Sequence, residues 1–201
     1  MSTRAPGRPR SEEARLAILG AAVALVGEGG SAFATMDAIA RRAGVSKQTV
    51  YRWWSSPAEI LLEALNEGAA HIAPLEEEGD LEQDLRTFLR RSVLGAREPV
   101  GRLLASLMAE AQRDPTFAES FRAGFLAKRR GVLRELLEHA VERGELEPDV
   151  DLDFLVELFF AALWYRLLAA SGPLDRRFAD NLTDALLTLA HAAAQRLRSP
   201  S

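Results

Sequence analysis

The sequence predicts an all-α protein of about nine helices, with a helix-turn-helix head near the N-terminus and a helical body behind it. Three observations predict this fold. Apolar residues recur at helical spacing along most of the chain, no stretch alternates apolar and polar residues as a strand does, and Gly, Pro and Asp mark the breaks. In addition, residues 35–54, TMDAIARRAGVSKQTVYRWW, have the layout of two short helices joined by a tight turn, which places one helix in the DNA major groove.

Three residues at the helix ends of this head are each typical of a helix-turn-helix. Thr35 is the predicted N-cap of a helix over residues 36–43, because its hydroxyl can accept an unpaired backbone N–H. Gly44 follows that helix, where a left-handed conformation is needed. Ser46 is the predicted cap of the second helix, and Val50 is expected to point inward.

The outward residues of the second helix suit a nucleic-acid surface. Lys47 and Gln48 lie in its first turn, which meets base edges in DNA-bound helices of this kind. Thr49 and Tyr51 supply hydroxyls at phosphate distance. The predicted DNA-binding residues are Thr35, Ser46, Lys47, Gln48, Thr49, Tyr51, Arg52 and Trp53, with Arg8 and Arg10 from the N-terminal arm.

Charge is distributed unevenly along the chain. The net charge of the 201 residues is −4, but residues 1–55 carry +4 and residues 56–201 carry −8. A basic head on an acidic body concentrates the field that attracts DNA at one end. Cysteine is absent, which excludes disulfides and thiolate metal sites and fits a cytoplasmic protein. The polar first ten residues do not resemble a signal peptide, and no membrane segment is expected.

The predicted domain order follows these signals. Residues 1–10 form a flexible basic arm, which could lie in the minor groove or make no fixed contact. Residues 11–56 form the DNA-binding domain, whose first helix is capped by Ser11. Residues 57–73 form a linker helix that opens with a capping box at Ser56 and Glu59 and runs to about Ile72. Residues 74–201 form an effector-binding and dimerisation domain.

Five further helices are expected in this body. They begin at Asp80, Pro99, Pro115 (a long helix to about residue 143), Leu152 and Leu174. The helix over 152–170 is apolar around most of its circumference, so it needs burial on two sides, one against its own body and one against a second subunit. The predicted dimer-interface residues are Phe154, Leu158, Phe178, Leu182, Ala185, Leu186, Leu189 and Ala193.

The body also holds many aromatic residues for its size. Small-molecule pockets are mostly apolar with a few polar groups, so we expect such a pocket here. The alternative is that the aromatic side chains fill the core or the dimer seam. The predicted ligand-binding residues are Leu104, Met108, Phe121, Phe125, Phe159, Trp164, Tyr165 and Arg166.

Nothing in the sequence indicates catalysis. The three histidines, His71, His139 and His191, lie on separate helices without a second ligand at metal spacing. No nucleophile elbow, phosphate loop or dinucleotide fingerprint is present. We therefore expect no enzyme activity, no metal and no cofactor.

The head resembles the tetracycline-repressor (TetR) family of transcriptional regulators. The resemblance covers roughly residues 11–65, and the size and helix count of the body agree with it. The residues that carry it are Thr35, Ile39-Ala40, Ala43-Gly44-Val45-Ser46, Thr49-Val50-Tyr51, Ser56 and Glu59-Ile60-Leu61, with weaker similarity at 113–115 and 144–151.

The resemblance implies a homodimer that binds a near-palindromic operator. It implies that the last two helices of each body form a four-helix interface, and that a small molecule moves the linker helix and releases DNA. It places Lys47 and Gln48 against bases and Trp54 in the head core. Many members have a phosphate-binding lysine where this chain has Pro57, so one charged contact per half-site is missing.

Two other functions remain open at this stage. One is a helical adaptor that keeps the head only as a structural element, although an adaptor has no need for Lys47, Tyr51 and the arm arginines together. The other is a DNA-binding regulator without a small-molecule effector. The sequence identifies neither the effector nor the operator.

Overall fold

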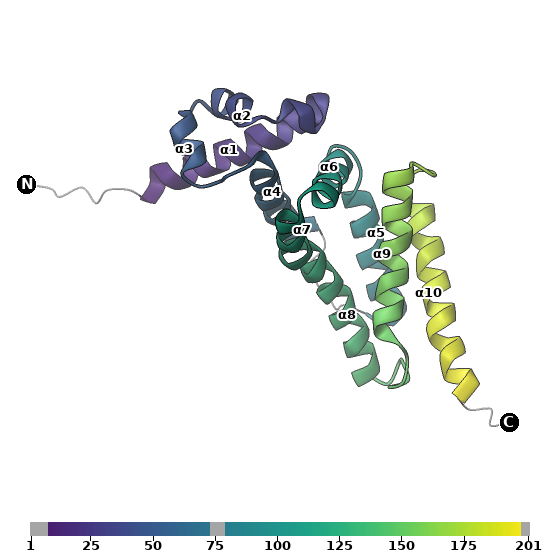
Figure 1. Cartoon of the computed structure of the whole chain (residues 1–201). Coiled ribbons are helices and arrows are strands. Elements are labelled where there is room, and N and C mark those ends of the chain that lie inside the picture. Colours follow the sequence, from purple (N-terminus) through teal and green to yellow (C-terminus); the bar gives the residue numbers. More distant parts are fainter. Residues whose placement is uncertain (1–7, 73–78, 198–201) are drawn as a thin grey trace, which may run out of the picture. The chain divides into compact units, whose positions relative to one another are not determined.

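The computed structural model describes residues 8–72 and 79–197, and every regular element within these ranges is a helix (Figure 1). The elements are α1 (Arg8–Gly29), a 3₁₀ turn η1 (Ser31–Phe33), α2 (Met36–Ala43), α3 (Lys47–Tyr51), α4 (Pro57–Ile72), α5 (Leu81–Gly95), α6 (Val100–Arg113), α7 (Pro115–Phe121), a π-helical segment η2 (Arg122–Leu126), α8 (Ala127–Glu142), α9 (Leu152–Ala169) and α10 (Arg176–Leu197). Because α7, η2 and α8 follow one another without a break, they correspond to the one long helix expected, and the predicted all-α fold is confirmed.

The chain divides into two compact units. The first comprises Met1–Gly68 and Glu98–Phe121, and the second comprises Ala69–Arg97 and Arg122–Ser201. The first unit therefore contains α6 and α7 in addition to the DNA-binding head, whereas the sequence suggested a body that begins after the linker helix. Within it, α1 packs on α2 and on α6.

The caps of the head have the predicted geometry. Thr35 Oγ1 accepts the backbone N–H of Ala38 at 3.2 Å, and Ser46 Oγ accepts that of Thr49 at 3.2 Å. Gly44 is left-handed, with φ 67° and ψ 28°, which ends α2 and lets the backbone N–H of Val45 reach the carbonyl of Ala40 at 3.0 Å. These three positions fix the angle between α2 and α3.

Gly44→Ala is expected to destabilise the protein by about 1 kcal/mol, because an L-residue is strained at positive φ. A Cβ at this position would meet no atom within 4 Å, so the backbone conformation alone sets the cost. Thermal unfolding should show a melting temperature lower by roughly 2–4 °C. The matched control is Gly20→Ala in α1, where a Cβ also meets nothing and the melting temperature should stay or rise. An equal loss in both variants would contradict this assignment.

Two helix starts differ from expectation. The first helix begins at Arg8 and not at Ser11, because Pro9 falls in its first turn, where proline is tolerated. The last helix begins at Arg176 and not at Leu174, because Asp175 caps it by accepting the N–H of Phe178 at 2.8 Å. In the linker helix, Ser56 caps as predicted.

The capping box of that helix closes on a different residue. The N–H of Glu59 donates to Ser56 Oγ at 3.3 Å. The Glu59 carboxylate, however, accepts the N–H of Ser55 at 2.8 Å and not that of Ser56. It also accepts the Ser55 hydroxyl.

The second unit is a layer of helices around a leucine-rich core. In it, α5 packs on α8 and α10, and α9 packs on α8 and α10 (Figure 1). Its fully buried side chains include Leu89 on α5, Leu133 on α8 and Phe159 on α9. Arg90 on α5 donates to Asp180 on α10 at 2.6 and 3.0 Å, and this guanidinium holds the pKa of the Asp180 carboxyl below its usual value.

In the ranges 8–72 and 79–197, no helix has the length and apolar character needed to cross a membrane.

Candidate nucleic-acid interface

Helix α3 packs against the rest of the head through one buried side chain, and its other side chains form a polar outer face. Val50 is fully buried, whereas Lys47, Gln48, Tyr51 and Arg52 are exposed. The ammonium of Lys47 lies 2.5 Å from Asp37 Oδ2 of α2, and both side chains are more than half exposed. The cation is therefore held next to the first turn of α3 and remains open to solvent.

The end of α3 is organised by two tryptophans. Trp54 is 5 % exposed and packs in the head core, as the family resemblance implied. The ring of Trp53 meets that of Trp54 edge to face, with centroids 5.4 Å apart. The guanidinium of Arg52 lies over the Trp53 ring at 5.1 Å. Trp53 thus orients Arg52 and is itself only half exposed.

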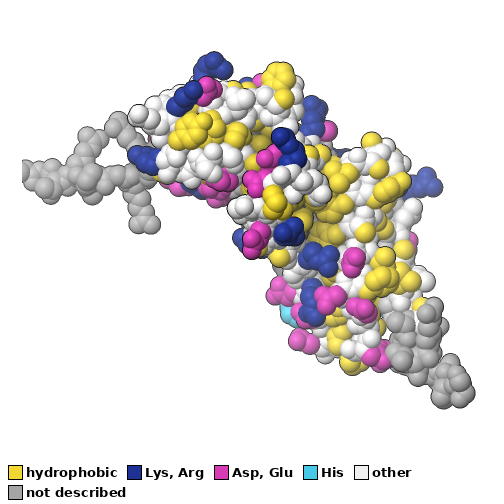
Figure 2. All heavy atoms as spheres, in the orientation of Figure 1, with side chains coloured by type: hydrophobic (Ala, Val, Ile, Leu, Met, Phe, Trp, Pro, Cys, Tyr) yellow, Lys and Arg dark blue, Asp and Glu magenta, His cyan; other side chains and the backbone are white. Residues whose placement is uncertain are grey.

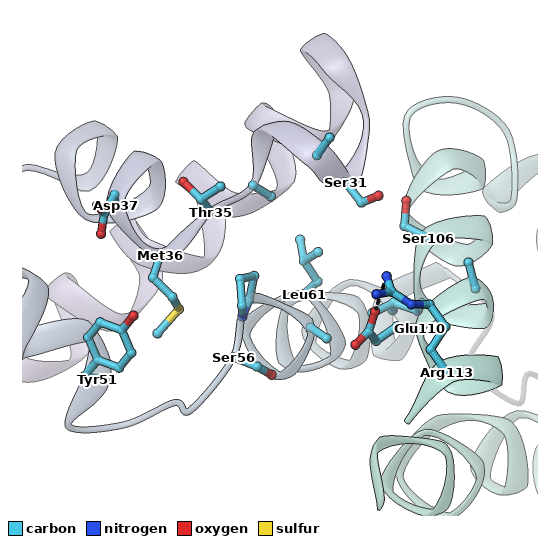
Figure 3. Close-up of a pocket in the computed structure, with 16 residues that line it drawn as sticks. Ser31, Thr35, Met36, Asp37, Tyr51, Ser56, Leu61, Ser106, Glu110 and Arg113 are labelled. Carbon is cyan, nitrogen blue, oxygen red and sulfur yellow. Dashed lines mark ion pairs between the residues drawn. The ribbon is translucent and has the colours of Figure 1, made fainter. Parts of the chain in front are cut away.

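A cleft of about 720 Å³ opens beside this surface, within the first unit (Figure 3). Thr35 and Tyr51 line one wall, Ser106 and Arg113 of α6 line the other, and the start of α4 lies between them. The first turns of α2 and α4 both face the cleft. Helix N-termini attract phosphate, whereas Asp37 and Glu110, which also line the cleft, repel it. A phosphate contact in this cleft stays a prediction.

The predicted DNA-binding residues are thus placed unequally. Thr35 and Tyr51 share the cleft, and Ser46, Lys47, Gln48, Thr49 and Arg52 lie on or next to α3. Arg8 and Arg10 belong to the first turn of α1, but their side chains lie outside the described residues. The minor-groove contact of the arm stays a prediction.

The predicted ligand-binding residues fall in both units. Leu104, Met108 and Phe121 belong to the first unit. The others, Phe125, Phe159, Trp164, Tyr165 and Arg166, belong to the second. A pocket shared by all eight stays a prediction.

Two of these eight residues lie away from the core. Tyr165 is 68 % exposed. The Arg166 guanidinium lies 3.8 Å from the ring centroid of Phe178 and donates to the carbonyl of Pro173 at 3.0 Å. Arg166 therefore secures the turn between α9 and α10, while Phe159 is fully buried in the core.

The structure adds a polar group that the sequence reasoning missed. Arg129 of α8 lies over the ring of Phe88 at 5.4 Å and donates to Ser92 Oγ at 3.2 Å. Burial lowers the pKa of its guanidinium. Phe88 in turn meets Phe159 edge to face at 6.2 Å. In the sequence, Arg129 stands in the basic run Lys128-Arg129-Arg130, where nothing distinguishes it from the neighbours on either side.

The predicted dimer residues separate into exposed and buried sets. Phe154 is 52 % and Leu189 45 % exposed, Ala185 is exposed, and Leu158 and Leu182 are half-buried. Phe178 and Leu186 are 9 % and 4 % exposed and belong to the core of their own chain, the first beneath Arg166. The side chain of Ala193 lies outside the described residues.

No group of three or more His, Asp or Glu side chains within the described part of the chain is arranged to hold a metal ion. The side chain of His71 lies outside that part.

Models of both family domains match the chain. The model described as bacterial regulatory proteins of the tetR family matches residues 18–64, and the one described as the tetracyclin repressor-like C-terminal domain matches residues 75–186. This chain belongs to the TetR family. It is therefore a DNA-binding transcriptional regulator with a helix-turn-helix head.

Relatives of this TetR-family regulator match over most of their length. The uncharacterized HTH-type transcriptional regulator YdeS of Bacillus subtilis is 32 % identical over 176 residues, which are 88 % of this chain and 89 % of YdeS. The DNA-binding transcriptional repressor TetR of Mycobacteroides abscessus is 31 % identical over 182 residues, 89 % of this chain and 94 % of the relative. The crystal structure of the TetR-family regulator SCO0332 superimposes with a TM-score of 0.74 at 35 % identity, covering 88 % of this chain and 97 % of that one.

Pro57→Lys tests whether a lysine at position 57, which many family members have, would contact a DNA phosphate. Pro57 lines the same cleft as Thr35 and Tyr51, so a lysine there would add an ammonium beside a bound phosphate. The slope of log affinity against log salt concentration should steepen by about 0.9 per head. Affinity should rise at low salt and converge with that of the parent at high salt. A salt titration with an unchanged slope would show that no phosphate lies near position 57.

Proposed function

We propose that this regulator is a homodimeric repressor that leaves a near-palindromic operator when a small apolar or amphipathic ligand binds its body. The dimer part of the proposal is supported by an exposed apolar face on α9 and α10. On α9, Phe154, Tyr165 and Leu168 are 52 %, 68 % and 49 % exposed, and on α10 Leu189 is 45 % exposed. Figure 2 shows apolar side chains among polar ones over the surface that these two helices form.

The spacing of these residues supports one continuous surface. Phe154, Leu158, Ala161, Tyr165 and Leu168 follow one another at steps of four and three residues, which places them on one face of α9. Helix α10 packs beside α9, and the spacing of three and four residues places Leu182, Ala185 and Leu189 on one face of it. An exposed apolar stripe on two neighbouring helices suits a second copy of the same pair, and we call it the seam.

DNA recognition rests on the exposed first turn of α3. The exposure of Lys47 and Gln48 in that turn supports contact with base edges, and the hydroxyls of Thr35 and Tyr51 in the cleft support contact with a backbone phosphate. Two heads in one dimer would contact two half-sites about one helical turn apart. Repression is favoured by the similar repressor from Mycobacteroides abscessus.

The ligand part of the proposal rests on the second unit. Arg129 places a cation over the ring of Phe88, which in turn packs edge to face against Phe159. Both rings are buried in the core, so a ligand would have to open a cavity beside them; the cation and the rings favour an amphipathic ligand that has an acidic end.

A reporter experiment tests the proposal as a whole. The protein is expressed in a heterologous host with a reporter behind its selected DNA site, and static light scattering measures its mass. A dimer that lowers reporter expression, and releases it with amphipathic acids added to the medium, agrees with the proposal. A dimer that raises expression contradicts repression, and a repressor that no such acid releases favours a regulator without a small-molecule effector.

A further inference from the structure

Three glutamates of α4 form a stripe that binds the rest of the head. Glu59, Glu63 and Glu67 stand four residues apart, so their carboxylates share one face of the helix. Glutamates at this spacing commonly pair with lysines or arginines of their own helix. Here the hydrogen bonds go to α1 and to the segment between α3 and α4.

Glu63 lies at the centre of this stripe. One of its oxygens accepts the indole N–H of Trp54 at 2.7 Å, and the other accepts a guanidinium N–H of Arg15 on α1. Arg15 also donates to Glu67 at 2.8 Å. At the start of the helix, Glu59 accepts the N–H of Ser55. Together these bonds join α1, the end of the recognition segment and the first three turns of α4.

These contacts contribute to the stability of the head because their side chains are partly shielded from water. Trp54 is 5 % exposed, so its indole N–H needs an acceptor inside the protein. The side chains of Arg15 and Glu63 are 23 % and 36 % exposed. Hydrogen bonds to Glu12, Glu67 and Glu63 raise the pKa of the Arg15 guanidinium.

We propose that Glu63 is a positioning residue, which makes α4 set the orientation of the recognition helix without touching DNA. This inference rests on the proposed function, since it says how α4 and α3 move together in a DNA-binding head. When α4 rotates, Glu63 moves with it. Trp54 and Arg15 then move as well, because both donate hydrogen bonds to the Glu63 carboxylate. The orientation of α3 therefore depends on a carboxylate nine residues beyond Trp54.

The first test compares operator binding by three variants. Glu63→Gln removes the charge that holds Arg15 but keeps the shape, and Trp54→Phe removes only the indole donor while keeping an aromatic ring. Each should weaken binding to the selected operator about 5- to 20-fold. The salt slope should stay unchanged, because no phosphate contact is lost. The losses in the double variant should be less than additive, because the carboxylate that Glu63→Gln removes is also the acceptor of the Trp54 indole N–H.

A matched control separates positioning from a general loss of charge. Glu28 pairs with Arg42 at 2.7 Å in the same head, but neither residue belongs to α4. Glu28→Gln should bind operator within twofold of the parent. Equal losses in Glu28→Gln and Glu63→Gln, or additive losses in the double variant, would overturn the inference.

Hydrogen exchange of the free protein gives a second readout that needs no operator. In Glu63→Gln the amides of residues 47–54 should exchange at least fivefold faster than in the parent, while those of α5 and α9 stay the same. Unchanged exchange over residues 47–54 would overturn the inference. A parent that selects no DNA site would overturn the proposed function, and the exchange result would still decide the role of Glu63.

Discussion

Tyr165→Glu combined with Leu168→Glu is expected to produce a monomer that binds its operator at least 100-fold more weakly than the parent. Both side chains are about half exposed or more in the seam, so the substitutions leave the core of the chain intact. In a dimer they would bury four carboxylates against apolar surface, and such burial costs several kcal/mol per ion. A monomer also loses the millimolar effective concentration that one bound head gives the second.

Light scattering at micromolar concentration and operator titration measure the two effects. The matched control is Leu16→Glu on α1, a leucine of 52 % exposure that lies outside the seam, and this variant should keep the mass of the parent. A double variant that remains dimeric would place the interface elsewhere. A parent that is itself monomeric would exclude the seam altogether.

Gln48→Ala is expected to lower the ratio of specific to non-specific DNA affinity about 30-fold or more. A bidentate base contact contributes about 1–3 kcal/mol to discrimination, and a dimer makes it twice, which gives roughly 2–6 kcal/mol. Gln48 is exposed in the first turn of α3, and the Ser46 cap does not depend on its side chain. Stability should therefore change little.

Competition titrations with the selected site and with random duplex measure that ratio. Binding to random duplex should stay within twofold, because no charge is removed. The control is Gln83→Ala, an exposed glutamine on α5, which should leave both affinities unchanged. A loss that is equal on specific and random DNA would mean that Gln48 contacts the backbone and not a base.

The head could be predicted closely because its signals are local. Thr35, Gly44 and Ser46 act within three or four residues of themselves, and the hydrogen bonds they make depend on backbone geometry that the sequence encodes directly. The sequence predicts that α10 starts at Leu174. The helix starts two residues later because Asp175, just before it, caps it by accepting the N–H of Phe178.

The burial of side chains in the body could not be predicted, because apolar periodicity does not say which neighbouring helix covers which face of a helix. Helix α9 is apolar nearly all round, so the exposed Tyr165 and the buried Phe159 look equivalent in the sequence. The sequence predicts Phe178 as a dimer-interface residue, but Arg166 covers its ring within the same chain. The sequence does not distinguish Glu63 for a related reason: a glutamate in a helix looks like a solvated side chain until its partners Trp54 and Arg15 are known.

The most direct test of this account is selection of the protein's binding site from a randomised duplex library at moderate salt, followed by sequencing. The account predicts enrichment of a near-palindrome whose half-sites lie about one helical turn apart. A folded protein that enriches a single half-site would contradict the homodimer. A folded protein that enriches no sequence would contradict the central claim that α3 recognises a specific operator.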